Sequence, residues 1–345
     1  MIAVILAGGR GSRLWPLSTD SCPKQFLEIV DGESLLKKTY FRAKSMADEV
    51  LIVTEISLAG MVEEELPDMP SEKILTEPAR RGTASCVLMA LDYLVRNGYE
   101  NENVVFMHSD NLFENDDLLK ECLLEVIDVA NGNTTVGLIG VVPTYPATKY
   151  GYIEKGNSIK RKCSLVKQFT EKPSYQVASG FLKTSRYLWN IGCSAGKVSD
   201  YIKNIKIFSE LLRNELAALE SFESFMEYNY AKRYLSFKDV SIDVGLFEKM
   251  NNLIVTEAEF DWADVGSYEI LHGLLDKDDR RNVVEGSGVV VAEDVEGAII
   301  INDEQKPVAV IGVSNIAVIS TSSGVLVADI RSADRIGDII KMKGI

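Results

Sequence analysis

Apolar positions in the first half of the chain form short continuous runs that alternate with longer stripes of helical spacing. The runs are rich in valine and isoleucine, as parallel strands buried on both faces are, and they predict strands over 2–7, 50–54, 103–107 and 134–141. The stripes predict helices over 34–46, 82–96 and 116–130. This alternation predicts an α/β fold with a Rossmann-like, doubly wound parallel sheet, in which ligands bind at the carboxyl ends of the strands.

The second half of the chain is patterned less regularly. We expect extended segments over 150–155 and 162–170, and helices over 198–204, 207–219 and 222–230. From residue 282 onward, short Val/Ile runs recur between Gly and Asp residues, which predicts a small all-β domain. The pattern therefore predicts two domains, 1–280 and 281–345.

Composition narrows the cellular setting. Of the 345 residues, 46% are hydrophobic, yet no apolar run approaches the ~20 residues that a membrane span needs. The five cysteines are scattered and form no C-x-x-C pair, which predicts reduced thiols and a cytoplasmic location. Because there are also only two histidines, we do not expect a zinc site.

The net charge of −14 makes nucleic acid and anionic membranes unfavourable partners. A chain of this charge that binds a polyphosphate has to gather its cations locally. Arg10, Arg13 and Lys24 do so near the N-terminus, and Arg80 and Arg81 form a second group.

The first predicted strand ends in a glycine-rich loop. Such a turn exposes backbone N–H groups that bind phosphate. Two common phosphate motifs are absent, because Leu14 follows where the dinucleotide pattern needs a third glycine and no Walker sequence occurs. Pro16 and Pro23 prevent a helix from following directly, so the loop is long enough to wrap around a ligand. A plain glycine turn is the structural alternative.

Residues 6–18 and 23–27 resemble the signature of the sugar-nucleotide pyrophosphorylases. Within that family they are most similar to the mannose-1-phosphate guanylyltransferases, whose pattern is L-A-G-G-x-G-[ST]-R-L-W-P-L-S followed by P-K-Q-F-L. The resemblance implies that Arg13 and Lys24 are the catalytic cations. It also implies a nucleotide-binding loop made of Leu6, Ala7, Gly8, Gly9, Gly11 and Ser12.

Two acids are candidate metal ligands. Asp110 follows a predicted strand, and Asp264 stands at a turn far along the chain. Mg²⁺ prefers oxygen ligands and usually takes one or two carboxylates together with substrate phosphates. The family holds its metal on aspartates at both places, so the resemblance implies that Asp110 and Asp264 bind Mg²⁺, with Mn²⁺ or Co²⁺ as alternatives, and that Asp110 contacts the nucleotide. Taken alone, each acid would more often be a turn or cap residue.

Residues 77–84 resemble the family segment E-P-x-x-R-N-T-A-P, which lies against the nucleotide base. Guanine presents two neighbouring donors on its pairing edge, and a carboxylate accepts both, so we interpret Glu77 as a candidate guanine reader. The alternative is an acid at the start of a helix, favoured by the helix dipole. The resemblance also assigns Arg81 and Thr83 to nucleotide binding.

Four further segments resemble the family's sugar site. The resemblance implies that Gly151 lets the backbone approach the hexose, that Glu171 and Asn190 bond its hydroxyls, that Lys172 holds its phosphate, and that Asp243 lies near the sugar. Isolated, Glu171 and Lys172 would suggest a surface turn, and Asp243 an N-cap.

The resemblance implies transfer of GMP from GTP to α-D-mannose 1-phosphate, giving GDP-mannose and pyrophosphate. It further implies a nucleotidyltransferase fold, similar to the GT-A fold, in which the doubly wound sheet is mixed. The resemblance also implies that the C-terminal domain is a short left-handed β-helix used for self-association, so we expect a homodimer, although an imperfect hexapeptide period leaves a small sandwich open.

Three different functions stay open on the sequence. Another sugar 1-phosphate, such as a manno-heptose, is an alternative substrate, and Tyr145, Ala147, Lys149 and Ile191 are where it would be selected. A non-catalytic regulator that binds nucleotide sugars is the second possibility, and a glycosyltransferase is the third. Glycosyltransferases commonly carry a D-x-D motif, but the sequence after Asp110 has Leu112 where the second aspartate would stand.

Overall fold

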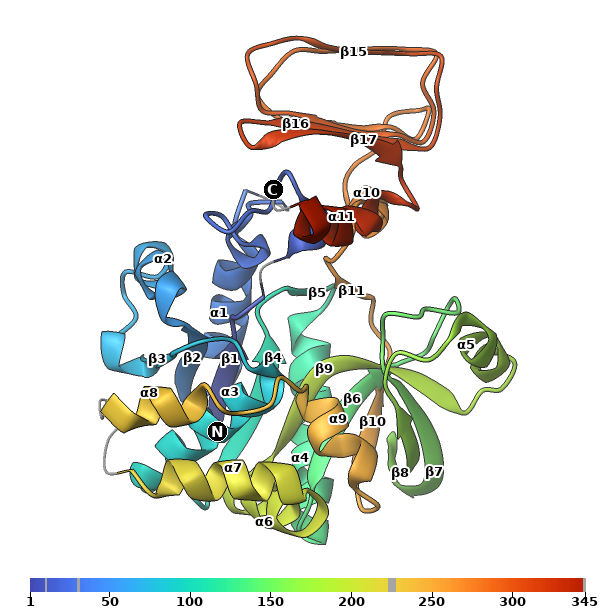
Figure 1. The fold of residues 1–345 in the computed structure, drawn as a ribbon. Coiled ribbons are helices and arrows are strands. Elements are labelled where there is room, and N and C mark those ends of the chain that lie inside the picture. The colour runs from blue at the N-terminus through green and yellow to red at the C-terminus, as the bar shows by residue number, and fades with distance from the viewer. Residues whose placement is uncertain (10, 30–31, 223–227, 344–345) are drawn as a thin grey trace. The chain divides into compact units, whose positions relative to one another are not determined.

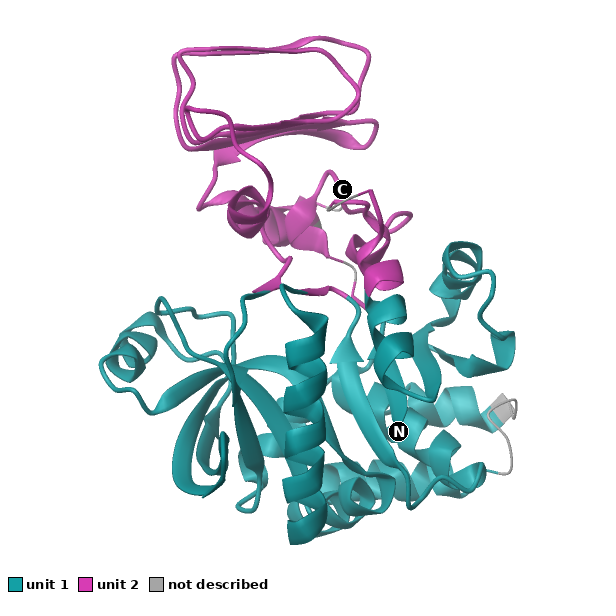
Figure 2. Ribbon diagram, turned by 180° about the vertical axis from the view of Figure 1, so that it is seen from behind, with its two compact units in different colours: residues 1–8, 39–109, 113–262 teal, residues 9–38, 110–112, 263–345 magenta. Residues whose placement is uncertain are grey.

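The computed structural model describes residues 1–9, 11–29, 32–222 and 228–343, which form two compact units (Figure 2). The first unit contains residues 1–8, 39–109 and 113–262, and the second contains residues 9–38, 110–112 and 263–345. From Gly9 onward, the glycine-rich loop therefore belongs to the same compact unit as the C-terminal strands. The sequence-based division into 1–280 and 281–345 stays a prediction.

A nine-stranded sheet forms the centre of the first unit, in the order β3-β2-β1-β4-β9-β6-β10-β8-β7 (Figure 1). Its strands are β1 (Ile2–Leu6), β2 (Glu49–Glu55), β3 (Ile74–Glu77), β4 (Asn103–His108), β6 (Val136–Val141), β7 (Tyr152–Lys160), β8 (Cys163–Thr170), β9 (Tyr187–Lys197) and β10 (Ile254–Ala258). Strands β1 to β4 pair in parallel, as do β6 and β10, whereas β9 runs antiparallel between β4 and β6. The predicted mixed sheet is confirmed, and every predicted strand of the first half is present.

Helices cover both faces of this sheet. Helices α3, α6 and α7 pack together on one face, and α4 lies against β6, β9 and β10 on the other (Figures 1 and 2). The helices of this unit are α2 (Ala59–Glu65), α3 (Gly82–Arg96), α4 (Asp116–Asn133), α5 (Tyr175–Leu182), α6 (Val198–Phe208), α7 (Glu210–Glu220), α8 (Tyr228–Tyr234) and α9 (Ile242–Gly245). Helix α1 (Leu35–Met46) contains the point at which the chain leaves the second unit. Most of the helix predicted over 222–230 lies outside the described residues.

Helix α4 follows from its sequence. Asn115 caps it, because its side-chain oxygen accepts a hydrogen bond from the Leu118 N–H at 3.0 Å. Asp116 and Asp117 fill the first turn, where the helix dipole favours negative charge. The helix ends at Asn133 and is capped by Thr134, whose φ of 53° is left-handed. Its apolar stripe is buried from Leu119 onward, whereas Leu118 in the first turn is 37% exposed, and the predicted helix is confirmed with three additional residues at its end.

The second unit contains two stacks of short strands. One sheet consists of β12 (Val283–Glu285), β14 (Ile299–Asn302), β16 (Ile316–Thr321) and β17 (Gly324–Asp329), and the other of β13 (Val290–Glu293) and β15 (Val308–Ile311). Pairing is parallel except between β16 and β17. Alternate residues of the larger sheet face different apolar clusters, since Ile319 packs in the cluster of Leu14 and Tyr268, whereas Val318 packs in that of Val310.

The strands predicted near the C-terminus are therefore present, but the segment is not entirely β. It continues into η6 (Ala333–Arg335) and helix α11 (Ile336–Lys343). Eight residues are too few for apolar spacing to identify a helix from sequence. No helix among the described residues is long and apolar enough to cross a membrane.

Candidate active site

Lys24 lies between the two aspartates predicted to bind metal. Its Nζ is 2.8 Å from Asp110 Oδ2 and 3.1 Å from Asp264 Oδ1. The aspartates meet because β5 (Asn111–Phe113) pairs with β11 (Trp262–Asp264), and the Val265 N–H donates to the Asp110 carbonyl oxygen at 3.4 Å. Three residues from distant parts of the sequence thus form one charged cluster within the second unit.

The residues around Lys24 keep its ammonium group protonated. The residue is 4% exposed, and burial by itself would lower the pKa of the ammonium group. The charges of Asp110 and Asp264 and their hydrogen bonds outweigh burial and raise this pKa above its ordinary value. The stabilisation from Lys24 is thus complete below the unfolded-state pKa and is lost only as pH rises through the raised pKa in the alkaline range.

The two carboxylates also suit a divalent metal. Both converge on a single cation, here the ammonium of Lys24, and their side chains remain 27% and 24% exposed. Among the described residues, no group of three or more His, Cys, Asp or Glu side chains could hold a metal. Two carboxylates open to solvent match Mg²⁺, which usually completes its shell with water and substrate phosphates.

Arg13 lies beside Asp264 in the same unit. It belongs to η1 (Ser12–Leu14), and a Cβ added to Gly266 would lie 3.0 Å from Arg13 Nη2 and 3.4 Å from Asp264 Oδ1. Gly266 therefore leaves room for the guanidinium next to the charged cluster. Sequence reasoning gave Gly266 no role, although its position two residues after the metal-binding candidate was a usable signal.

Gly11 lets the main chain next to Arg13 approach Lys24 closely. Its φ of 67° is left-handed, and an added Cβ would lie 2.3 Å from Lys24 Cβ and 2.9 Å from Ser18 Oγ. Any other residue would displace Lys24, which begins η2 (Lys24–Phe26). Gly9 approaches the cluster less closely, with an added Cβ 3.9 Å from Asp110 Oδ2. Arg10 lies outside the described residues.

Leu6, Ala7 and Gly8 belong to the first unit, at the carboxyl end of β1. The Ser109 N–H donates to the Leu6 carbonyl oxygen at 3.1 Å, and Thr54 Oγ1 donates to that of Ala7 at 2.9 Å. An added Cβ on Gly8 would lie 3.2 Å from Glu77 Oε1. The structure thus brings Gly8 and Glu77 together.

Glu77 is the last residue of β3 and is 1% exposed. Tyr234 donates its hydroxyl to Glu77 Oε2 at 2.8 Å. Burial raises the pKa of this carboxyl, whereas hydrogen bonds from Tyr234 and Cys86 and the charge of Arg80 act in the opposite direction. Helix α3 begins only at Gly82 and has no acid in its first turn, so the helix-start interpretation is wrong. Nothing in the sequence indicated Tyr234 as its partner.

Arg81 and Thr83 bond to the protein itself. Arg81 donates from Nε and Nη2 to the Leu235 carbonyl oxygen at 3.0 and 2.9 Å. Thr83 Oγ1 accepts from the Ile242 N–H at 2.9 Å, next to Asp243. Their predicted contacts with nucleotide stay predictions.

The five residues predicted for the sugar lie together in the first unit. The Asn190 N–H donates to the Gly151 carbonyl oxygen at 2.9 Å, and Asn190 Nδ2 donates to Asp243 Oδ1 at the same distance. An added Cβ on Gly151 would lie 2.8 Å from Glu171 Oε2, and Lys172 pairs with Glu171 at 2.8 Å. Ser241 also caps α9, as its hydroxyl accepts from the Val244 N–H, so capping does not require Asp243.

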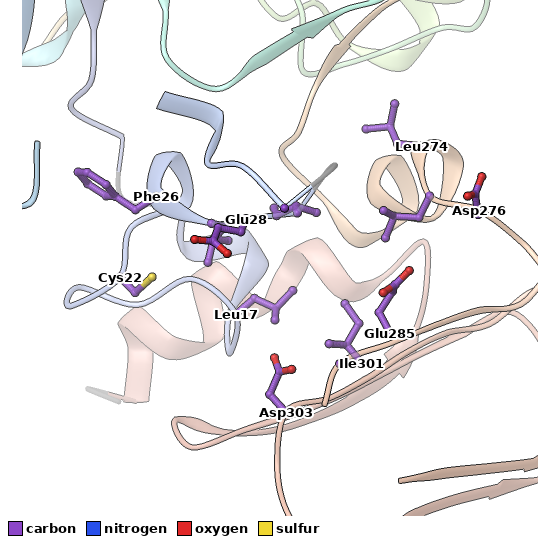
Figure 3. A pocket seen from close by; sticks show the side chains of 14 residues that line it. Leu17, Cys22, Phe26, Glu28, Leu274, Asp276, Glu285, Ile301 and Asp303 are labelled. Carbon is purple, nitrogen blue, oxygen red and sulfur yellow. The ribbon is translucent and has the colours of Figure 1, made fainter. Parts of the chain in front are cut away.

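A cavity of about 710 Å³ lies elsewhere in the second unit, next to η2 (Figure 3). Apolar side chains such as Leu17 and Phe26 share its lining with Glu28, Asp276, Glu285 and Asp303. No predicted site residue is among its described lining. Four carboxylates would repel a polyphosphate, so this cavity does not suit a nucleotide.

Comparisons with known proteins identify the family of the chain. A match to the nucleotidyl transferase family covers residues 2–280. The chain therefore belongs to the nucleotidyl transferase family and is an enzyme of that class.

Its relatives define a narrower group. The chain is 30% identical over 350 residues to a mannose-1-phosphate guanylyltransferase of Salmonella montevideo, covering 98% of this chain and 73% of the relative. It is 30% identical over 336 residues to one from Escherichia coli, covering 95% and 70%. The fold matches the crystal structure described as a mannose-1-phosphate geranyltransferase from Thermus thermophilus, with a TM-score of 0.88, 29% identity, and coverage of 100% and 99%.

Proposed function

We propose that this enzyme transfers GMP from GTP to α-D-mannose 1-phosphate, giving GDP-mannose and pyrophosphate. The observation that carries the proposal is the charged cluster of Lys24, Asp110 and Asp264, in a chain whose relatives over almost its whole length are mannose-1-phosphate guanylyltransferases.

The chemistry needs no protein nucleophile. A phosphate oxygen of the sugar 1-phosphate attacks the α-phosphorus of GTP in line, the bond from that phosphorus to the bridging oxygen breaks, and pyrophosphate leaves. The attacking group is already an anion, so the difficulty is to bring two anions together. Arg13 and Lys24 offset that repulsion and stabilise charge on the leaving group.

Asp110 and Asp264 would hold Mg²⁺, with Mn²⁺ or Co²⁺ as alternatives. When bound, the metal neutralises phosphate charge and orients the phosphates. Backbone groups of the loop bind the phosphates, and Glu77, Arg81 and Thr83 bind the nucleoside. The loop residues concerned are Leu6, Ala7, Gly8, Gly9, Gly11 and Ser12. Gly151, Glu171, Asn190 and Asp243 bind the sugar, and Lys172 binds its phosphate.

Release of pyrophosphate tests the proposal directly. The assay compares GTP, UTP, dTTP, CTP and ATP, each with mannose, glucose and N-acetylglucosamine 1-phosphates, in Mg²⁺ and after chelation. We expect rapid, metal-dependent release only with GTP and mannose 1-phosphate. Release with GTP but a poor response to every hexose would point to another sugar, such as a manno-heptose, and no release from folded protein would favour the non-catalytic regulator.

Glu77→Gln is expected to weaken the preference for GTP by about 10–100-fold, the usual worth of a charge-assisted hydrogen bond. The amide presents a donor where guanine also presents donors, while Tyr234 keeps an oxygen to which it can donate. The measurement is kcat/KM for GTP relative to UTP and ATP. Glu72→Gln, an exposed acid shortly before β3, is the control, and unchanged selectivity of Glu77→Gln would leave Glu77 only a structural role.

The affinity for sugar 1-phosphate is expected to depend on Asp243. Burial and then the charge of Glu171 raise the pKa of Asp243 to about 6, against the opposing effects of His108 and Lys172. The ionised carboxylate is the better acceptor for sugar hydroxyls, so KM should fall as pH rises through about 6. The substrate phosphate also titrates near pH 6, so the two enzymes must be compared at each pH. The ratio of the KM of Asp243→Asn to the KM of the native enzyme should increase as pH rises through about 6.

Thermal unfolding checks the same group without substrate. The folded-state pKa of Asp243 lies above the unfolded value of about 3.9. The folded protein therefore holds more protons between these values, and the contribution of Asp243 to stability falls as pH rises from about 4 to about 6. Asp243→Asn should raise Tm relative to the native protein above pH 6 and not near pH 4. A constant Tm difference would contradict the shifted pKa.

We also propose a domain boundary near residue 280, a left-handed β-helix in the C-terminal segment, a homodimer and a cytoplasmic location. The end of the family match at residue 280 supports the boundary, and the parallel stacks β12-β14-β16 and β13-β15 support the β-helix. Val325 and Val327 of β17 are 62% and 66% exposed, which supports self-association through this end of the stack. The free cysteines support the location.

A further inference from the structure

Hydroxyl groups from C-terminal residues converge on the loop that carries Arg13. Tyr268 donates its hydroxyl to the Leu14 carbonyl oxygen at 2.7 Å and to that of Trp15 at 3.1 Å. Thr321 Oγ1, at the end of β16, donates to the Pro16 carbonyl oxygen at 3.2 Å. The main chain from residue 14 to residue 16 is thus held by groups that lie 254 and 305 positions away in the sequence.

Two glycines allow a still closer approach. An added Cβ on Gly324 would lie 2.6 Å from Trp15 Cζ2, so the indole ring lies directly over the turn between β16 and β17. An added Cβ on Gly337 of α11 would lie 3.0 Å from Ser12 Oγ and 3.4 Å from both Cγ and the main-chain nitrogen of Arg13. The contacts therefore bracket Arg13 on both sides along the chain.

The core of the second unit explains why these contacts hold together. Leu14 is fully buried and packs in one apolar cluster with Tyr268, Ile319 and Ala333. That cluster unites η1, the larger C-terminal sheet and the residues just before α11. A shift of the C-terminal segment would consequently shift the main chain on which Arg13 stands.

We propose that the C-terminal segment, through Thr321, Gly324 and Gly337, positions Arg13 for catalysis. These are positioning residues, because they touch the arginine or its loop and not the substrate. The inference rests on the proposed function, in which Arg13 stabilises the transferring phosphates. It gives the C-terminal segment a part in the reaction in addition to self-association.

Gly337→Ala provides a test in which stability and activity change in different directions. Gly337 lies in a helix, where alanine is the better helix former, so a purely structural role predicts equal or greater thermal stability and normal turnover. The added methyl group instead lies 3.0 Å from Ser12 Oγ, so Ser12, the residue before Arg13, has to move by a few tenths of an ångström, while Arg13 itself comes into van der Waals contact at 3.4 Å. We expect kcat to fall about tenfold, because small misplacements of catalytic groups are costly, with little change in the KM for either substrate.

The matched control is Gly273→Ala. Gly273 lies in α10 (Tyr268–Leu274) of the same unit, and an added Cβ there meets no atom within 4 Å. Its turnover should stay normal. A second variant, Thr321→Val, keeps the side-chain shape but removes the hydroxyl that holds Pro16, and it should also lower kcat. Normal kcat in both Gly337→Ala and Thr321→Val would overturn the proposal.

A double-mutant cycle shows whether Gly337 acts through Arg13. If it does, adding Gly337→Ala to Arg13→Ala should cost less than about a twofold further loss, because the group that it positions is already absent. If the two substitutions lower kcat by factors that simply multiply, they act independently, and the inference is overturned while the proposed function stays intact. Normal turnover of Arg13→Ala alone would instead refute the catalytic role of Arg13.

Discussion

Lys24→Met is expected to lower kcat for pyrophosphate release by about 10²–10³, the usual loss when one preorganised charge-stabilising group is removed. Methionine keeps most of the volume of the buried side chain but removes the ammonium that contacts Asp110 and Asp264. Without it, the leaving pyrophosphate loses a fixed positive charge that the protein shields almost entirely from solvent. The measurement is kcat at saturating GTP, sugar 1-phosphate and Mg²⁺.

The dependence on Mg²⁺ separates lost chemistry from lost structure. In Lys24→Met the two aspartates face each other without their shared cation, so their repulsion should be relieved by metal, and half-maximal activity should need less Mg²⁺. A variant that was merely misfolded would show no such change. Lys306→Met removes an exposed lysine of the same unit and is the control. Near-normal turnover of Lys24→Met would refute its role in catalysis.

The α/β fold could be predicted because its signals are local. The buried strands of the first half are continuous Val/Ile runs, and α4 has both a cap and an apolar stripe, so each element can be identified within a few residues. β9 was missed because it mixes aliphatic, aromatic, polar and small residues without a Val/Ile run. It pairs with β4, β6 and β7. A strand held mainly by its neighbours leaves little trace in its own sequence.

The candidate site likewise contains residues that could be predicted from sequence and residues that could not. Glycine loops and acids after strands could be found from sequence because they are short, ordered patterns that resemble those of a known family. The surroundings of Glu77 could not, since Tyr234 lies 157 residues away and belongs to no motif. Likewise, the sequence pattern assigned residues 281–345 to an appendage. In the structure, Gly324 and Gly337 of this segment approach the loop around Arg13. The importance of a missing side chain at these two positions shows only in the tertiary packing.

Arg13→Ala is expected to reduce kcat by about 10²–10³ as well, but for a reason that differs from that of Lys24. Lys24 is buried and holds two carboxylates, whereas Arg13 is half-buried and lies beside Asp264 across Gly266. Its guanidinium offers several donors in a fixed plane, which suits phosphate oxygens. The loss should therefore appear in kcat, with the Mg²⁺ requirement unchanged, in contrast to Lys24→Met.

Arg13→Lys distinguishes charge from geometry at this position. Lysine restores the positive charge without the planar set of donors, so we expect it to recover only part of the lost turnover. Arg280→Ala removes an arginine that is 62% exposed and pairs with the exposed Asp294, and it should behave like the native enzyme. Full recovery by Arg13→Lys would mean that charge alone is required, and it would also weaken the case for precise positioning by Gly337, because a flexible lysine needs no rigid support.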